Sequence, residues 1–345
     1  MNRLAIIGDQ FMLPDVLERK VIELLDEPLD IKKLNQNWPD KPLEHGYGTP
    51  GMDGLKEYMG VAEEVVEFIG DADMLLTHLA PMSEGMFAQL PKLKFIAVTR
   101  GGPVNIDMTA AKKRGVTVVN TPGRNASAVA EFTLGAMISE SRLIRTGHES
   151  MRHGEWRGDL YRYDKTGREL NEMTIGVIGY GHIGKRVVAL LRAFGAKILV
   201  HDPYVQLSVE DVNSGVELAG FDTLLANSDL VTLHARVTPE TEQMMNAEAF
   251  AKMKPDSIFV NTARGPLVNY EDLETALTRS DIGSAVLETF SVEPLPEESP
   301  LRSLPNVTLT PHIAGASVRT VTCAAEQAAD EIKRYLAHQS PKNPC

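Results

Sequence analysis

The chain has 345 residues, of which 43% are apolar and 24% are charged, and its formal net charge is −12. This length fits about two domains of ordinary size, and no continuous apolar run approaches the roughly 18 residues that would span a bilayer. The negative net charge argues against binding to a nucleic-acid backbone, which requires clustered basic residues. Neither a membrane nor a nucleic acid is therefore an expected partner.

Apolar runs of strand length recur along the chain and are separated by turns or helix-like stretches. This alternation predicts a parallel α/β architecture. The first run follows N-terminal residues that lack the apolar core and cleavage site of a signal peptide, so we expect a buried strand there. The predicted strands are LAIIG (4–8), DMLLTHLA (73–80), LKFIAVT (93–99), TVVN (117–120), TIGVIG (174–179), KILVHD (197–202), DLVTLHA (229–235), SIFVNTA (257–263) and NVTLTP (306–311).

The stretch between Asn125 and Trp156 has the length and the Ala, Leu and Glu content of an extended amphipathic helix. We expect this helix to carry the chain from one domain into the next. The following segment, 157–170, is polar and contains two tyrosines. For this segment, a solvated surface loop is favoured over an arm that contacts another subunit.

The most specific local pattern lies between Thr174 and Asp202. A strand, the turn Gly179-x-Gly181-x-x-Gly184, a helix and a second strand follow each other without a break. In such a unit the first glycine permits a tight turn, the second lets the backbone approach a pyrophosphate, and the third lets the helix pack on the sheet. The helix N-terminus then faces the phosphates. The pattern predicts a dinucleotide site rather than an ordinary turn.

Asp202 ends the second strand of this unit. Its carboxylate is placed to accept hydrogen bonds from the adenosine ribose hydroxyls, and its charge would repel a 2′-phosphate. The sequence therefore predicts NAD, rather than NADP, as the cofactor.

Three polar residues follow later strands: Arg264 in VNTARGPLVN, Glu293 in SVEPLP and His312 in LTPHIAGAS. The carboxyl ends of parallel strands line the ligand crevice in such folds. A planar guanidinium can hold the oxygens of a 2-oxo acid, and an imidazole held by a carboxylate can donate a proton to the carbonyl. Taken singly, the three are more readily explained as an ion-pair partner, a loop charge and a capped histidine. Together they predict one proton-transfer unit.

The chain has two cysteines, Cys323 and Cys345. They are too few for a disulfide framework or a cysteine metal site, which suits a reducing cytoplasm. The histidines, including His182 and His234, show no metal-ligand spacing such as HExxH, so no metal is expected.

Further motifs are spread from about Asp71 to Ala316. They are PKLKFIAVTRGGPVNID, VVNTPGRNASAVAEFTLG, VIGYGHIG with HDP, LHARVTPETEQMMN, KPDSIFVNTARGPLVN, and VEPLP through TPHIAG. In this order, the motifs resemble the D-isomer-specific 2-hydroxyacid dehydrogenases, which include D-3-phosphoglycerate dehydrogenase, D-lactate dehydrogenase and glyoxylate/hydroxypyruvate reductases. The resemblance implies NAD-dependent transfer of a hydride to or from the 2-carbon of a small D-2-hydroxy or 2-oxo acid.

The resemblance also implies roles for individual residues. Arg264, Glu293 and His312 occupy the family's catalytic positions. The backbone amides of His78, Leu79 and Ala80, and the neighbouring loop with Arg100, Gly101 and Gly102, occupy its substrate-binding positions. Besides the three glycines of the turn, the implied cofactor-binding positions are His182, Ile183, Asp202, His234, Ala235, Thr241, Thr262, Ala263 and Glu288.

The family fold consists of two Rossmann-like domains with parallel sheets, in which the cofactor domain is inserted into a discontinuous substrate domain. The resemblance places the substrate-binding domain at 1–122 and 313–345 and the cofactor domain at 123–312, and it implies a homodimer. Two features depart from the family pattern. Glu288 in LETF replaces an aspartate, and the glycine-rich segment VTRGGPVNID is shorter than usual.

The resemblance also extends to two other functions. Formate dehydrogenases of this fold carry Gln at the position of Glu293, which argues against formate as the substrate. A transcriptional corepressor that resembles the family keeps the Arg/Glu/His set, so a role in NAD-controlled binding is an alternative from another class. Among substrates, 3-phosphoglycerate, glycerate or hydroxypyruvate, glyoxylate, lactate and longer acids stay open. Arg100 and Arg124 are candidates for phosphate contacts, but they fit equally well as structural cations.

Overall fold

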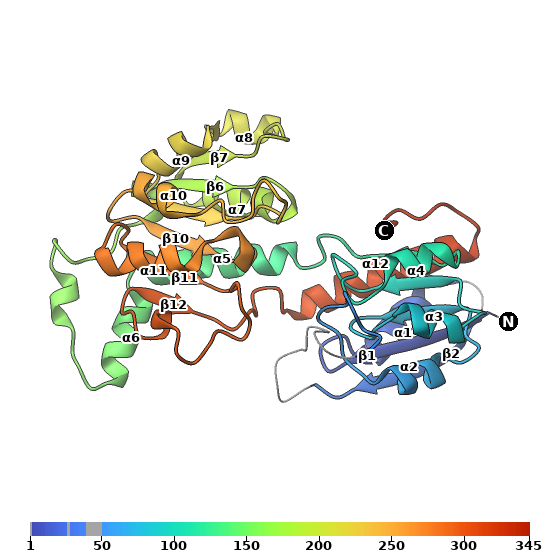
Figure 1. The fold of residues 1–345 in the computed structure, drawn as a ribbon. Coiled ribbons are helices and arrows are strands. Elements are labelled where there is room, and N and C mark those ends of the chain that lie inside the picture. Colours follow the sequence, from blue (N-terminus) through green and yellow to red (C-terminus); the bar gives the residue numbers. More distant parts are fainter. Residues whose placement is uncertain (1, 26–27, 39–49) are drawn as a thin grey trace. The chain divides into compact units, whose positions relative to one another are not determined.

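The structure, a computed structural model, describes residues 2–25, 28–38 and 50–345. The chain divides into two compact units (Figure 1). The first unit is built from both ends of the chain, Met1–Asn125 and Ser317–Cys345, and the second is the continuous segment Ala126–Ala316. Each unit contains one parallel sheet, so the predicted α/β fold with two parallel sheets is confirmed.

The first unit has a five-stranded parallel sheet in the order β2-β1-β3-β4-β5. Its strands are β1 (Arg3–Asp9), β2 (Asp30–Gln36), β3 (Met74–Thr77), β4 (Phe95–Val98) and β5 (Thr117–Val119). Its helices are α1 (Pro14–Leu24), α2 (Ala62–Ile69), α3 (Glu84–Gln89), α4 (Met108–Lys113) and α12 (Val318–Leu336).

Alternate residues of β1 enter two different hydrophobic cores. Leu4 and Ile6 pack in a core that includes residues of α1 and α12. Ala5 and Ile7 pack in the other core, which includes residues of α2, α3 and α4. Because a strand buried on both faces needs apolar residues at every position, the continuous run LAIIG forms the centre of a covered sheet.

The segment after α12 returns to the edge strand β5 of the same unit. Val119 and Pro344 form an antiparallel bridge, and the Cys345 N–H donates to Val118 O at 3.0 Å. The buried carboxylate of Glu331 accepts the backbone N–H groups of residues 342 and 343. These contacts hold the C-terminal residues against the sheet and cover its β5 edge.

The second unit has a seven-stranded parallel sheet in the order β12-β11-β10-β9-β6-β7-β8. Its strands are β6 (Thr174–Ile178), β7 (Lys197–His201), β8 (Glu217–Leu218), β9 (Leu230–Leu233), β10 (Ile258–Asn261), β11 (Ser284–Leu287) and β12 (Val307–Leu309). Its helices are α5 (Ala126–Ser141), α6 (Ile144–Arg152), α7 (His182–Ala193), α8 (Val209–Asn213), α9 (Phe221–Asn227), α10 (Ala247–Lys252) and α11 (Tyr270–Arg279), with 3-10 turns at Gly158–Tyr161, Leu170–Glu172, Gly265–Leu267 and Pro300–Arg302. The order of strands reverses between β6 and β9, as it does in doubly wound nucleotide-binding sheets.

The prediction of one extended amphipathic helix between Asn125 and Trp156 was wrong. The segment forms two helices, α5 and α6, which run in different directions (Figure 1). They are separated at Leu143, whose φ of 57° lies in the left-handed region that a continuing helix cannot use. The buried residues of α5 recur at spacings of three and four and therefore lie on one face of the helix, so it is the turn at Leu143, and not the burial pattern, that departs from the prediction.

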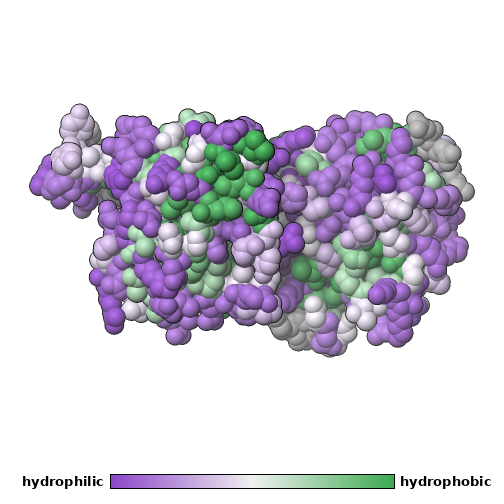
Figure 2. Space-filling view, turned by 90° about the horizontal axis from the view of Figure 1, so that it is seen from above, coloured by the Kyte–Doolittle hydropathy of each residue, from purple (hydrophilic) through white to green (hydrophobic). Residues whose placement is uncertain are grey.

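The surface of the second unit carries a patch of hydrophobic side chains on the face that Figure 2 shows. In segment 157–170, both Tyr161 and Tyr163 are almost fully exposed, as is Trp156 just before it. A contiguous exposed hydrophobic patch is typical of interaction surfaces. Among the described residues, no helix combines the length and the apolar character that crossing a membrane would need.

Candidate active site

The glycine turn lies at the carboxyl end of β6. Gly179 has a φ of +94°, and a Cβ at Gly184 would lie 2.0 Å from Gly179 O, so the first turn of α7 packs on the backbone of the loop. A Cβ at Gly181 would meet no atom within 4 Å, and Gly181 caps α7 without a side-chain hydrogen bond. The backbone amides at this helix N-terminus are therefore open to an anion, which is what a pyrophosphate requires.

Asp202 follows β7 and reaches the same turn. Its Oδ2 accepts the Tyr180 N–H at 2.8 Å, and its Oδ1 accepts the Tyr204 N–H at 3.0 Å. The carboxylate is half-buried, and each oxygen keeps a lone pair for a further donor. A ribose diol is a donor of this kind.

His234 and Ala235 follow β9 and lie against the glycine turn, since a Cβ at Gly179 would lie 2.6 Å from Ala235 N. Burial lowers the pKa of His234 to about 3, so its ring is neutral. Its Nε2 lies 3.1 Å from Thr232 Oγ1, whereas Nδ1 is buried without a partner among the described residues. The predicted positions His182 and Ile183 form the first turn of α7.

Three further predicted cofactor positions have polar partners inside the second unit. Thr241 Oγ1 donates to a carbonyl of its own loop at 2.6 Å, and Thr262 Oγ1 lies 2.7 Å from Thr133 Oγ1 on α5. Glu288 is 1% exposed, and its Oε1 accepts the Ala314 N–H at 2.9 Å. Burial raises the pKa of Glu288. These bonds shape the loops around the site, and the cofactor contacts of the three residues stay predictions.

Arg264, Glu293 and His312 follow the neighbouring strands β10, β11 and β12. His312 Nδ1 lies 2.8 Å from Glu293 Oε2, and the positive charge of Arg264 acts on His312 strongly enough to oppose its protonation. The structure therefore brings the three predicted residues together at one edge of the sheet.

The loop that carries Arg264 is held by a close backbone approach. A Cβ at Gly265 would lie 2.0 Å from the carbonyl carbon of Phe290, so only glycine lets these loops touch. The Arg264 side chain is exposed, and its Nη1 donates to Ala263 O at 2.7 Å. Within the described ranges no carboxylate forms an ion pair with it. Its guanidinium can therefore bind an anion from outside the chain.

The His312–Glu293 pair is fixed from both sides. Glu293 Oε1 accepts the Phe290 N–H at 2.9 Å. His312 has a φ of 54°, and its N–H donates to Glu288 O at 3.0 Å. A non-glycine residue in the left-handed region is uncommon and is often found at functional sites.

The charge of Glu293 determines the protonation of His312. Partial burial lowers the pKa of His312, but the hydrogen bond that its ring donates to Glu293 and the negative charge of Glu293 outweigh burial, so the pKa lies above the ordinary 6.5. The His312 side chain is 39% exposed and that of Glu293 is 29% exposed. The pair thus favours the protonated imidazole and is open to a ligand.

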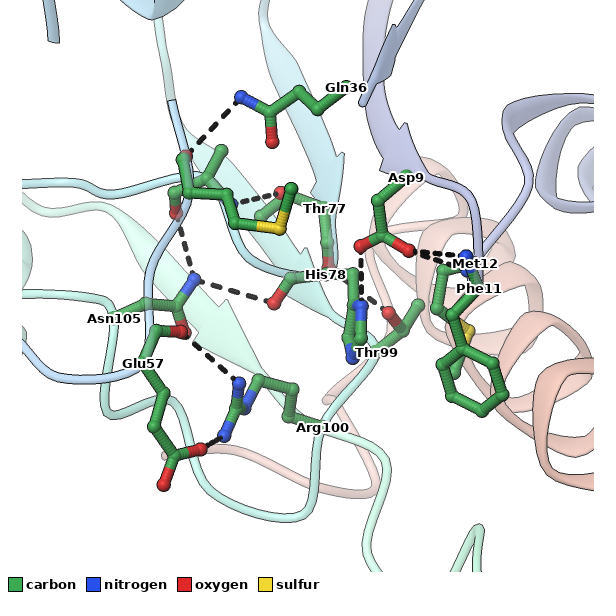
Figure 3. A network of polar contacts seen from close by, with 12 residues as sticks. Asp9, Phe11, Met12, Gln36, Glu57, Thr77, His78, Thr99, Arg100 and Asn105 are labelled. Carbon is green, nitrogen blue, oxygen red and sulfur yellow. Dashed lines mark hydrogen bonds and ion pairs between the residues drawn. The ribbon is translucent and has the colours of Figure 1, made fainter. Parts of the chain in front are cut away.

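The predicted substrate loops lie in the first unit (Figure 3). His78, Leu79 and Ala80 directly follow β3 and are buried. The Ala80 N–H already donates to Thr77 Oγ1 at 3.1 Å. Arg100 follows β4 and forms an ion pair with Glu57. Beside it, a Cβ at residue 101 or 102 would meet no neighbouring atom. The roles of these loops toward a substrate stay predictions.

Comparison with known proteins settles the family. Residues 134–314 match "D-isomer specific 2-hydroxyacid dehydrogenase, NAD binding domain". YoaD of Bacillus subtilis (strain 168), whose name assigns it to the 2-hydroxyacid dehydrogenases, is 42% identical over 286 residues, 80% of this chain and 81% of YoaD. The glyoxylate reductase of Thermofilum pendens is 38% identical over 304 residues, 85% of this chain and 90% of that protein. The chain belongs to the D-isomer specific 2-hydroxyacid dehydrogenase family.

The fold of this 2-hydroxyacid dehydrogenase family member also matches solved structures. The NAD complex of a D-isomer specific 2-hydroxyacid dehydrogenase from Lactobacillus delbrueckii ssp. bulgaricus has a TM-score of 0.80, with 100% of each chain covered and 22% identity. At this identity, the match is evidence for the fold alone. The predicted enzyme class is confirmed: the chain is an oxidoreductase of this family with an NAD-binding domain.

Two side chains near the substrate loops of the dehydrogenase were missed as a site by the sequence analysis. Asp9 lies 2.6 Å from His78, and Arg124 has a buried Nη1. The signal for Asp9 is its position directly after the first apolar run, at the carboxyl end of β1. Arg124 was noted only as a candidate cation, because the chain alone does not tell which cations lack a carboxylate.

Proposed function

We propose that this dehydrogenase transfers a hydride between NAD and C2 of a small D-2-hydroxy or 2-oxo acid. The observation that carries the proposal is the His312–Glu293 hydrogen bond near the charge of Arg264, which forms no ion pair with any described carboxylate. In this proposal, the unit Ala126–Ala316 is the cofactor domain, predicted at 123–312, and the other unit is the substrate-binding domain, predicted at 1–122 and 313–345. A symmetric homodimer stays a prediction.

The residues divide the chemistry of 2-oxo acid reduction between them. The fork of Arg264 holds the carboxylate and the carbonyl oxygen of the substrate in one plane and polarises the carbonyl. His312 donates its proton to that oxygen as the carbonyl becomes a hydroxyl. Glu293 keeps the imidazolium oriented and charged. When NADH is bound, it supplies the hydride that adds to C2.

The dinucleotide site fits NAD on three observations. The α7 amides are open beside Gly181, Asp202 lies at the end of β7 with lone pairs to spare, and the buried Nδ1 of His234 lacks a partner among the described residues. The first would hold the pyrophosphate and the second the adenosine ribose. A panel of 2-oxo acids, with oxidation of NADH followed by absorbance, tests the function directly. Failure to reduce any 2-oxo acid, together with tight NADH binding, would favour the corepressor-like alternative.

The wild-type enzyme is expected to use NADH in preference to NADPH. Asp202→Asn keeps an oxygen for the Tyr180 N–H but removes the charge that opposes a 2′-phosphate. Loss of a charge-assisted contact of this kind changes binding by about 10-fold or more. The ratio of kcat/KM for NADH to that for NADPH should therefore fall by at least about that factor in Asp202→Asn. Asp256→Asn, a change of an exposed aspartate of the same unit, is the control. Equal efficiency of the wild type with both cofactors would contradict the assignment.

The pH dependence of reduction tests the His312–Glu293 pair. Only protonated His312 can donate, so kcat/KM for reduction should fall as the pH rises through its pKa, and oxidation should show the opposite limb. Because Glu293 raises that pKa, Glu293→Gln should move the falling limb to lower pH and leave less active enzyme near neutrality. The pH profiles of the wild type, Glu293→Gln and the exposed control Glu298→Gln decide the point. A limb that stays in place in Glu293→Gln would show that the pairing does not set the pKa.

A further inference from the structure

Tyr180 stands between the first two glycines of the turn after β6, and its backbone and its hydroxyl bind different parts of the second unit. The backbone N–H donates to Asp202 Oδ2 at 2.8 Å. The residue is 1% exposed, and its ring packs in a core that includes residues of α7 and β7. The hydroxyl donates to Asp211 Oδ2 on α8. One residue thus links the glycine turn, the carboxylate of Asp202 and α8.

Asp211 is a buried carboxylate, 5% exposed, and both of its oxygens accept hydrogen bonds. Besides the Tyr180 hydroxyl, Oδ2 accepts the Ser208 hydroxyl at 2.8 Å, and Oδ1 accepts Arg192 Nη1 at 2.8 Å. Burial opposes the ionisation of Asp211, but these bonds outweigh burial and lower its pKa. Burial and the bond to Asp211 both raise the pKa of Tyr180, so the phenol keeps its proton and donates. Because a buried carboxylate is costly without its donors, the network holds these groups in fixed positions.

The loop between β7 and α8, residues 203–208, is anchored at both ends by this network. It starts directly after Asp202, which the Tyr180 N–H holds, and it ends at Ser208, the N-cap of α8. Ser208 Oγ accepts the Asp211 N–H at 3.1 Å and donates to the Asp211 carboxylate. Since Asp211 also accepts the Tyr180 hydroxyl, both ends of the loop are tied to one residue of the glycine turn.

A change in the direction of the Tyr180 side chain would move its backbone N–H, and with it the Asp202 oxygen that this N–H holds. Groups that orient a binding residue affect ligand affinity without touching the ligand. We propose that Tyr180 and Asp211 are positioning residues for the adenosine half of the cofactor, and that they act through the carboxylate of Asp202. The inference rests on the proposed function, in which Asp202 holds the adenosine ribose.

Binding of ADP-ribose, measured by calorimetry, separates the adenosine half of the cofactor from hydride transfer. Tyr180→Phe removes one hydroxyl and keeps the ring in the core. We expect the Kd for ADP-ribose to rise by about 10-fold, an effect that loss of a hydrogen bond to a charged group can produce. The Kd for NADH should rise by the same factor, and kcat at saturating NADH should not fall.

A double-mutant cycle distinguishes positioning from a general loss of stability. Asp202→Ala alone should weaken ADP-ribose binding, because it removes the carboxylate that Tyr180 holds. In this background, Tyr180→Phe should raise the Kd further by less than about 2-fold, since the two changes act on one contact. Equal fold-changes in the two backgrounds would show that Tyr180 supports the fold and does not act through Asp202.

Asp211 offers a second pair of variants. Asp211→Ala removes the acceptor of the Tyr180 hydroxyl and should weaken ADP-ribose binding about as much as Tyr180→Phe does. Asp211→Asn keeps an amide that can bond to this hydroxyl, so its Kd should stay within about 3-fold of the wild type. Equal weakening by the two Asp211 variants would contradict a role for the hydroxyl bond.

Two control variants in the same unit accompany these measurements. Ile282→Val removes a methyl group from the other core of the unit, so it lowers Tm without touching the network. Tyr163→Phe removes the hydroxyl of an almost fully exposed tyrosine. Both should keep the wild-type Kd for ADP-ribose. A rise in Ile282→Val equal to that in Tyr180→Phe would mean that any loss of stability weakens the site, and the inference would be overturned.

The outcomes separate this inference from the proposed function. If ADP-ribose binding depends on Tyr180 and Asp202 as expected but the wild type reduces no 2-oxo acid, the proposed function fails and the positioning role stands. If the wild type reduces 2-oxo acids with NADH but the Kd of Tyr180→Phe stays within about 2-fold of the wild type, the inference is overturned and the proposed function stands. A wild type that binds neither ADP-ribose nor NADH would overturn both.

Discussion

Replacement of His312 by alanine is expected to lower kcat for 2-oxo acid reduction by about 100-fold to 10,000-fold, the range that a positioned general acid contributes. His312 is the proton donor in the proposed reaction, and its Nδ1 is held by Glu293 at 2.8 Å. Binding of NADH should be unchanged, because the contacts described for Asp202 and for the glycine turn involve residues other than His312. Stopped-flow turnover and NADH fluorescence measure the two effects separately.

His148→Ala is the matched control for that change, since His148 is an exposed histidine of the same unit. It should leave both turnover and NADH binding as in the wild type. Normal turnover in His312→Ala would mean that another group donates the proton. Loss of NADH binding along with turnover would mean that the change damaged the fold, and the conservative variant His312→Gln would then replace it.

Replacement of Arg264 by lysine is expected to lower kcat/KM by about 100-fold, through both a lower kcat and a higher KM. A lysine ammonium keeps the charge but not the planar fork, so it can attract the carboxylate without aligning the carbonyl for transfer, and a misplacement of about 1 Å can cost that much. The lysine also loses the second arm that donates to Ala263 O at 2.7 Å in the wild type. Initial rates over a range of 2-oxo acid concentrations measure the effect.

Arg279→Lys, at an exposed arginine in the last turn of α11, controls for the substitution itself. An unchanged kcat with only a raised KM in Arg264→Lys would reduce the role of Arg264 to charge attraction. No change in either constant would remove Arg264 from the active site.

Most of the fold could be predicted because its central strands are apolar throughout. The nine predicted runs all correspond to strands, whereas β2, β8 and β11 were missed. β2, with the sequence DIKKLNQ, is an edge strand with no fully buried residue, and β8 has only two residues. Edge strands need not be apolar, so hydrophobicity does not reveal them. The prediction of one extended helix was wrong for another reason. The left-handed turn at Leu143 contains no glycine, which is the usual sequence signal for such a turn.

The candidate site was predictable where a residue follows a recognisable strand, as Arg264 and His312 do, whereas Glu293 follows β11, which was missed. Arg264, Glu293 and His312 follow consecutive strands of one sheet, so the topology alone places them together. Asp9 and His78 also lie at the ends of neighbouring strands, β1 and β3, but the sequence does not tell that these two strands pair. The burial of Arg124 Nη1 without a hydrogen-bond partner among the described residues depends on its surroundings in three dimensions, which a local sequence pattern does not show.

The origin of the first unit from both ends of the chain has a consequence for synthesis on the ribosome. Strands β1 to β5 emerge early, but α12, which packs in one core with Leu4 and Ile6, emerges only after the continuous segment Ala126–Ala316. At the usual elongation rates, this delay is roughly 10 to 40 s. The second unit can complete its sheet during that time, while the apolar face that α12 later covers stays open to water and to chaperones. Nascent chains of this protein should therefore carry an unfinished first unit until the last helix is released.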